Sequence, residues 1–139
     1  MRATVLVLLA LAAGWPAQAA PKDATEARLD ACLDSPDGVS TAGQTECYGA
    51  ALKAYDARMN AAYGWLVKRL PAAAVKDLRT SQRAWIAFRD AERRANLAVF
   101  STRQGTMYVP MASASALSVV RDRALALEAY VRVMTIEGP

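Results

Sequence analysis

An unbroken helical repeat of apolar side chains occupies the end of the chain, and it excludes most folds. These side chains follow one another at steps of three and four: Leu117, Val120, Ala124, Leu127, Val131 and Met134. This spacing places side chains on one face of an α-helix, whereas a half-buried strand would need strict alternation. The segment therefore predicts a long amphipathic helix with one buried face.

The same spacing recurs in two earlier segments. From about Thr45 to Leu70 the repeat consists of Tyr48, Leu52, Tyr55, Met59, Ala62 or Tyr63, and Leu66. From about Ala73 to Val99 one face carries Val75, Leu78, Gln82, Trp85, Arg89 and Glu92. Trp65 falls off the main stripe, so it is the best candidate for an exposed aromatic, although partial burial is expected. Both segments predict long helices.

Turn-forming residues separate these segments. "DATEARLDACL" predicts a short first helix with Asp23 or Thr25 as its N-cap, and "DSPDGVSTAG" predicts a loop after it. Pro71 separates the two long helices, and Gly105 and Pro110 in "STRQGTMYVPM" predict an exposed loop. We therefore expect an all-α fold: a small antiparallel helical bundle of three long helices plus a short N-terminal helix.

The first nineteen residues differ in composition from this helical region. Arg2 precedes the apolar run "ATVLVLLALAA", and small residues fill "AQA" at positions 17–19. This pattern predicts a secretory signal peptide, residues 1–19, and leaves 20–139 as a single domain. A membrane anchor is the alternative, but Trp15 and Pro16 interrupt the run. The mature protein is expected to be periplasmic or secreted, without stable membrane insertion.

Two cysteines, Cys32 and Cys47, lie in the mature part of the chain. Paired thiols in an exported protein usually form a disulfide, and closing a loop of this size contributes roughly 3 kcal/mol. Because the sequence contains no histidine, a zinc site would have too few ligands. We therefore expect one structural disulfide, no metal and no cofactor.

The lack of histidine also restricts catalysis. Ser-His and Cys-His nucleophile systems are excluded, and the sequence has no G-x-S-x-G, P-loop or S-x-x-K motif. Asp56 or Asp90 with a raised pKa could act as a general acid, but the sequence shows no second carboxylate paired with either. The chain is therefore predicted not to be an enzyme.

Two motifs lie in the middle helices. The first is D-x-x-M-N-x-x-Y, formed by Asp56, Met59, Asn60 and Tyr63, and the second is Q-x-x-W-x-x-x-R-D, formed by Gln82, Trp85, Arg89 and Asp90. With the cysteine spacing and "RDRALAL" in the last helix, they make the chain resemble the LprI-like lysozyme-inhibitor family of exported bacterial proteins. The resemblance implies an all-helical exported domain, and at least one member of the family inhibits lysozyme.

The chain departs from this family in one respect. Members commonly have a second cysteine pair, but here Arg93 occupies the first position and "SASALS" contains no cysteine for the second. We therefore expect the loop between the last two helices to be less constrained than in relatives.

The motif residues predict a structural polar seam. If the two middle helices pack antiparallel across Pro71, an Asp56–Arg89 ion pair should form, with Asn60 near Gln82, because buried polar groups need partners. The seam would consist of Asp56, Asn60, Gln82, Trp85, Arg89 and Asp90. A ligand or catalytic pocket and a direct inhibitory surface are the alternatives.

Two functions agree with these features. The first is inhibition of a lysozyme or muramidase by occlusion of its cleft, through a partner-binding loop with Ser101, Arg103, Gln104, Thr106 and Tyr108. The net charge of +4, or +3 without Arg2, disfavours basic animal-type lysozymes and favours an acidic or endogenous muramidase. The alternative is a periplasmic envelope adaptor or small binding module. Nucleic acid is not expected as a partner, and the sequence does not indicate an oligomeric state.

Overall fold

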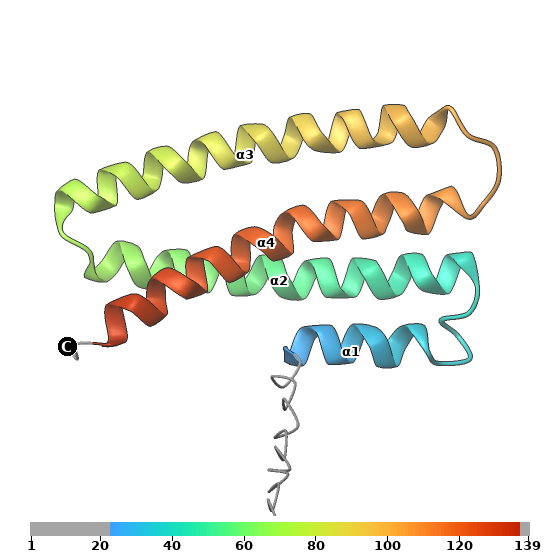
Figure 1. Ribbon diagram of the computed structural model, residues 1–139, viewed down its shortest axis with the longest axis horizontal. Coiled ribbons are helices and arrows are strands. Elements are labelled where there is room, and N and C mark those ends of the chain that lie inside the picture. The colour runs from blue at the N-terminus through green and yellow to red at the C-terminus, as the bar shows by residue number, and fades with distance from the viewer. Residues whose placement is uncertain (1–22, 137–139) are drawn as a thin grey trace, which may run out of the picture.

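The computed structural model describes residues 23–136, which form four helices and, within that range, no strand. They are α1 (Ala24–Leu33), α2 (Thr41–Arg69), α3 (Ala72–Ser101) and α4 (Tyr108–Ile136) (Figure 1). The predicted all-α bundle of three long helices and one short helix is confirmed. The predicted signal peptide, residues 1–19, lies outside the described range.

The helices begin at side chains that cap their free backbone N–H groups. The Asp23 carboxylate accepts hydrogen bonds from the backbone N–H groups of Thr25 and Glu26, so the prediction of Asp23 as N-cap is confirmed. The Ser40 hydroxyl accepts from Gly43 in the same way. This cap starts α2 at Thr41, four residues earlier than predicted.

The last helix also starts earlier than its apolar repeat. α4 begins at Tyr108, and Pro110 is buried in its first turn. Proline is tolerated there because the first N–H groups of a helix have no intrahelical acceptor. The predicted loop is therefore shorter than expected and spans only residues 102–107.

The packing order of the helices differs from their order in the sequence. α2 and α4 lie side by side, α1 lies along α2, and α3 lies along the other side of α4 (Figure 1). The predicted close packing of α2 against α3 is wrong over most of their length, because α4 takes that place.

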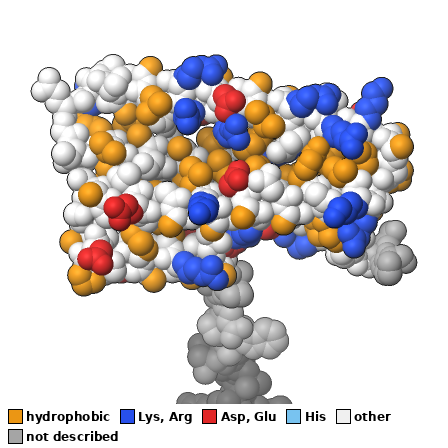
Figure 2. All heavy atoms as spheres, turned by 180° about the vertical axis from the view of Figure 1, so that it is seen from behind, with side chains coloured by type: hydrophobic (Ala, Val, Ile, Leu, Met, Phe, Trp, Pro, Cys, Tyr) orange, Lys and Arg blue, Asp and Glu red, His pale blue; other side chains and the backbone are white. Residues whose placement is uncertain are grey.

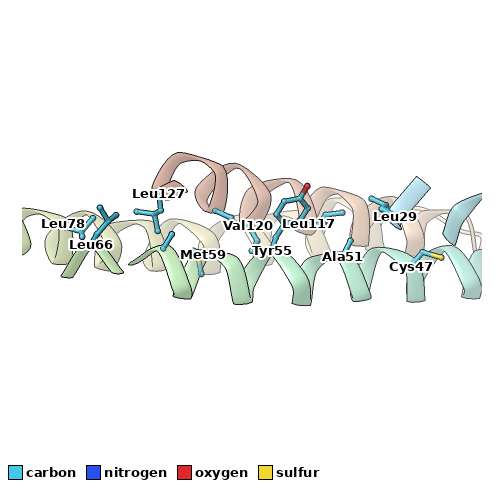
Figure 3. Close-up of a cluster of buried hydrophobic side chains, with 12 residues drawn as sticks. Leu29, Cys47, Ala51, Tyr55, Met59, Leu66, Leu78, Leu117, Val120 and Leu127 are labelled. Atoms are coloured by element: carbon cyan, nitrogen blue, oxygen red, sulfur yellow. The ribbon is translucent and has the colours of Figure 1, made fainter. Parts of the chain in front are cut away.

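The core runs along the α2–α4 contact (Figure 3). Tyr55, Leu66 and Leu127 are its largest fully buried side chains. The remaining buried apolar residues are Leu29, Cys47, Ala51, Met59, Ala62, Leu78, Leu117, Val120 and Ala124. By contrast, the buried residues of α3 are only Leu78 and Gln82 within the described range, so most of this helix packs loosely.

A disulfide joins the end of α1 to the start of α2. Cys32 and Cys47 are bonded, with 5.8 Å between their Cα atoms, as predicted. The turn inside this ring is tight: a Cβ at Gly38 would clash with the Cys32 carbonyl, and one at Gly43 with the Asp37 carbonyl. Glycine at both positions therefore lets the chain reverse within the ring.

None of the helices in the 23–136 range is sufficiently long and apolar to cross a membrane.

Candidate functional site

The glutamine of the second motif connects three helices. Gln82 is buried on α3; its amide nitrogen lies 3.8 Å from the Met59 sulfur on α2, and its amide oxygen accepts from Arg123 on α4 at 2.9 Å. Arg123 also donates to the Ser81 hydroxyl at 3.3 Å. Because a buried amide without partners would be costly, this arrangement fixes the register of α3 on α4.

The other expected pairings of the motifs are not formed. Arg89 pairs with its neighbour Asp90 at 2.8 Å, and the Asp56 carboxylate accepts from the Asn60 amide at 3.0 Å. The expected Asp56–Arg89 ion pair is therefore wrong, and Asn60 is exposed on α2 rather than bonded to Gln82. The physical reason is packing: α3 rests mainly on α4, and each of these charged groups has a partner on its own helix.

Three of these side chains border one cavity instead. Asp56, Arg89 and Asp90 line a space of about 220 Å³ between α2, α3 and α4, whose apolar lining includes Val119 and Val120. Trp85 is half-buried beside it, with the Arg89 guanidinium carbon 5.4 Å from its ring centroid. The first motif and the second motif therefore meet at a cavity rather than at an ion pair.

The predicted partner-binding loop joins α3 to α4 at one end of the molecule (Figure 1). Ser101 is the last residue of α3 and Tyr108 the first of α4. The side chains of Arg103, Gln104 and Thr106 are exposed and have no hydrogen bond or ion pair with other residues of the 23–136 range. Their polar groups are therefore free to contact a partner.

A larger cleft lies next to this loop. It has a volume of about 530 Å³ and is bounded by α3, the loop and α4. Arg103 and Tyr108 line it together with Arg93 and Phe100. In the view from behind, hydrophobic side chains lie exposed between basic and acidic side chains (Figure 2). The loop borders a cleft whose lining is apolar and basic.

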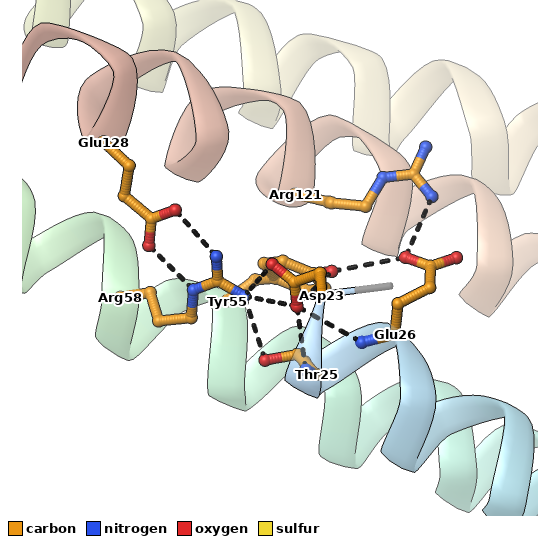
Figure 4. A network of polar contacts seen from close by, with 7 residues as sticks. All are labelled: Asp23, Thr25, Glu26, Tyr55, Arg58, Arg121 and Glu128. Carbon is orange, nitrogen blue, oxygen red and sulfur yellow. Dashed lines mark hydrogen bonds and ion pairs between the residues drawn. The ribbon is translucent and has the colours of Figure 1, made fainter. Parts of the chain in front are cut away.

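A polar network on the opposite side of α4 was missed by sequence reasoning (Figure 4). Its centre is Arg58, whose guanidinium donates two hydrogen bonds of 2.7 Å to the Glu128 carboxylate on α4. The same group donates to the Asp23 carboxylate at 2.7 Å and to the Thr25 hydroxyl at 3.1 Å. A single arginine thus joins α1, α2 and α4.

Tyr55 extends the network into the core. Its hydroxyl donates to Asp23 at 3.2 Å and to Glu26 at 3.3 Å, and the Arg58 guanidinium carbon lies 4.8 Å from its ring centroid. Glu26 also lies 3.7 Å from Arg121 of α4. Each charged group of the network therefore has an oppositely charged neighbour.

The network shifts the acid–base behaviour of its members. Partial burial alone would raise the pKa of Asp23, but hydrogen bonds from Arg58 and from the backbone of Thr25 and Glu26 outweigh burial and lower it. Burial, together with the charges of Asp23 and Glu26, raises the pKa of Tyr55 to about 12. Glu128 raises the pKa of Arg58 further above neutrality, against the effect of burial. At neutral pH Asp23 and Arg58 therefore stay charged, and Tyr55 stays neutral.

This closed set of contacts indicates a structural role for the network. Its donors and acceptors already satisfy one another, and the described residues contain no group of three or more acidic, cysteine or histidine side chains placed to hold a metal ion. A sequence signal for it did exist: Arg58 and Glu128 flank the apolar stripes of α2 and α4, next to Met59 and Leu127.

Trp65 is half-buried, as expected for an aromatic at the margin of the core. The Arg69 guanidinium carbon lies 4.3 Å from its ring centroid, one turn further along α2. A neighbouring cation therefore lies over the face of this ring.

Comparison with known proteins connects this architecture to a family. The family described as "Lysozyme inhibitor LprI" matches residues 32–127, a span that includes both motifs, the 102–107 loop and Arg58. The chain belongs to the LprI lysozyme inhibitor family. The family name describes inhibitors rather than enzymes, which agrees with the sequence expectation.

A solved structure has the same fold. The chain is similar to an uncharacterized protein from Burkholderia thailandensis, with 39% sequence identity and a TM-score of 0.74. The match covers 79% of this chain but 54% of that one, so this chain spans about half the length of that protein. No curated protein matches the chain.

Proposed function

We propose that this chain is an exported, non-enzymatic protein that inhibits a lysozyme by occluding its glycosidase cleft. Membership of the LprI family over residues 32–127 is the observation that carries the proposal. The 102–107 loop, with Ser101 and Tyr108 at its ends, is the proposed contact surface, because it lies at one end of the bundle and the side chains of Arg103, Gln104 and Thr106 have no hydrogen bond or ion pair with another described residue.

The chemistry of this loop suits a glycosidase cleft. Such enzymes cleave their substrate with a pair of Asp or Glu carboxylates. The Arg103 guanidinium can pair with a carboxylate, and the Gln104 amide and Thr106 hydroxyl can donate hydrogen bonds to it. Inhibition then requires no covalent step, only a loop that fills the cleft.

Export is part of the same proposal. Residues 1–19 have the composition of a signal peptide, and the Cys32–Cys47 disulfide is typical of proteins in an oxidising compartment. Among the motif residues, Gln82 is proposed to position α3 on α4. No contact with the enzyme is proposed for Asp56, Asn60, Gln82, Trp85, Arg89 or Asp90.

Charge indicates the kind of target. The net charge is +4, or +3 once Arg2 is removed with the signal peptide. A basic inhibitor is repelled by a basic lysozyme and attracted by an acidic one. We therefore expect an acidic or endogenous bacterial muramidase to be inhibited more strongly than basic animal lysozymes.

A lysis assay tests the proposal. The oxidised chain beginning at Ala20 is added to a panel of animal and bacterial lysozymes, and the rate of cell-wall lysis is measured against inhibitor concentration. We expect dose-dependent inhibition that weakens about tenfold in Arg103→Ala, the effect of losing one charged hydrogen bond. Arg79→Ala, which removes an exposed arginine near the other end of α3, should leave inhibition unchanged. Absence of inhibition across the panel would refute the proposal.

A second candidate is a small envelope adaptor without lysozyme activity. The exposed apolar side chains of α3 favour it, since Phe88, Leu97 and Val99 are each more than half exposed, at 54%, 55% and 64%. If the panel shows no inhibition while an envelope protein binds α3, this second function replaces the first.

A further inference from the structure

The cleft between α3 and α4 has the size and lining of a binding site for a small amphiphilic molecule. Its volume of about 530 Å³ lies within the range of roughly 300–1,000 Å³ that is usual for ligand sites. Apolar side chains from both helices form its walls: Leu97, Phe100, Val109, Ala112 and Ala116. Leu97 and Val109 are each 55% exposed, so an apolar ligand would cover surface that now contacts water.

The charges of the cleft have one sign. Arg93 and Arg103 line it, and none of the described side chains that line it is acidic. Neither guanidinium group has a hydrogen bond or ion pair with another residue of the 23–136 range. The Asn96 amide and the Tyr108 hydroxyl add further hydrogen-bond donors. An anionic group is therefore the complementary partner for this lining.

The neighbouring cavity shows that this charge pattern is local. The space of about 220 Å³ shares Arg93, Asn96 and Ala116 with the cleft, but it is also lined by Asp56, Asp90 and Glu92. Arg89 in that cavity is paired with Asp90. The smaller cavity thus has carboxylates beside its arginines, whereas the lining of the larger cleft carries positive charge alone.

We propose that the α3–α4 cleft binds a fatty acid, a single apolar chain with one carboxylate, free in solution. The apolar chain lies against Leu97, Phe100 and Val109, and the positive charges of Arg93 and Arg103, on either side of this wall, attract the carboxylate. A second copy of this chain is a poorer occupant, because a symmetric contact through this cleft would bring arginines to face arginines. The proposal does not rest on lysozyme inhibition, and its test contains no lysozyme.

The test uses laurate as the probe and the oxidised chain beginning at Ala20, which contains all four described helices. Displacement of a fluorescent dansyl-undecanoate measures binding at concentrations below micelle formation. Laurate should bind at least tenfold more tightly than dodecyltrimethylammonium, which has the same chain length and the opposite charge.

Matched variants locate the site. Arg93→Gln and Arg103→Gln should each weaken laurate binding about three- to fivefold, as expected for partly exposed ion pairs, and the double variant more than tenfold. Arg94→Gln removes the adjacent arginine, which does not line the cleft, and should change binding less than twofold. Leu97→Asp should abolish binding while circular dichroism shows unchanged helix content, since Leu97 is largely exposed.

Several results would overturn the proposal. They are no laurate binding by the unmodified chain, equal affinity for the cationic amphiphile, or equal losses in Arg93→Gln and Arg94→Gln. Binding of anionic phospholipid vesicles in preference to free laurate would indicate a membrane surface instead. A dimer that depends on Leu97, or tight binding of an acidic amphipathic peptide without laurate binding, would assign the cleft to a protein partner.

Discussion

The two sides of α4 are built in opposite ways. On the side that faces α1 and α2, Tyr55 and Leu127 are fully buried, and the charged groups around Arg58 pair with one another. On the side that faces α3, the α3 side chains of Leu97 and Val99 are exposed. A cavity and a larger cleft also remain between α3 and α4. Close packing and satisfied charges give the first side its stability, whereas the second retains free surface for binding.

Truncation of one apolar side chain on each side of α4 should give the largest difference in the free energy of unfolding. Leu127→Ala removes a side chain with 0% exposure and should lower the free energy of unfolding by about 2–5 kcal/mol. Leu97→Ala removes the same atoms from a site that is 55% exposed and should change it by less than about 0.5 kcal/mol. Urea unfolding followed by circular dichroism measures both. Similar losses in the two variants would show that α3 contributes as much stability as α4.

Loss of the disulfide should have the next largest effect. The Cys32→Ser/Cys47→Ser double variant should lose about 3 kcal/mol in the free energy of unfolding, because the unfolded chain regains the entropy of an open loop. The urea midpoint with and without reductant measures the same quantity on the unmodified chain. A midpoint that reductant does not move would mean that the ring contributes nothing to stability.

Substitution of one arginine on each side of α4 should give a smaller difference in the free energy of unfolding. Arg58→Met removes the guanidinium that donates to the Glu128 and Asp23 carboxylates and should lower the free energy of unfolding by about 1–3 kcal/mol. Arg89→Met loses the exposed contact with its neighbour Asp90 and the contact with the Trp85 ring, so its effect should stay within about 0.5 kcal/mol. Thermal melts of both variants provide the comparison. A larger loss of stability in Arg89→Met than in Arg58→Met would mean that the predicted polar seam, rather than the Arg58 network, stabilises the bundle.

Acid titration should show the smallest effect. The pKa of Asp23 is lower in the folded protein than its usual value of 3.8, so the unfolded chain takes up the proton first. The stabilisation is complete above about pH 5 and is lost as the pH falls through the folded pKa. The Glu26 and Glu128 carboxylates face the same network. Urea unfolding at pH 7, 5, 4 and 3 should show a smaller acid-induced loss in Asp23→Asn than in the unmodified chain.

The helices themselves could be predicted because their apolar spacing is local information. The repeat from Tyr48 to Leu66 marks the buried face of α2, and Leu117, Val120, Ala124 and Leu127 form the buried face of α4. The disulfide also followed from composition and compartment. By contrast, the start of α4 was misplaced because Pro110 suits both a loop and a first helical turn.

The pairing of helices could not be predicted in the same way. The helices α2 and α3 are neighbours in the sequence, so they were expected to pack together. The apolar face of α2 packs instead on the apolar face of α4, because polar side chains interrupt the corresponding face of α3. Gln82, Arg89 and Glu92 lie within that α3 face. Full burial of this face would require a hydrogen-bond or ion-pair partner for each of these polar groups. The Arg58–Glu128 pair escaped prediction because its members are seventy residues apart and meet only once α2 and α4 are paired.

The first helix is held at both of its ends, and this changes how it can open. Ten residues are too few for a helix that is stable alone in water. Yet the carboxylate before its first turn is held by Arg58, and its last turn is covalently joined to α2. Fraying, which usually begins at free helix ends, therefore has no end from which to start. The amides of α1 should exchange with solvent only when the α2–α4 pair itself opens, so this short helix belongs to the same cooperative unit as the core.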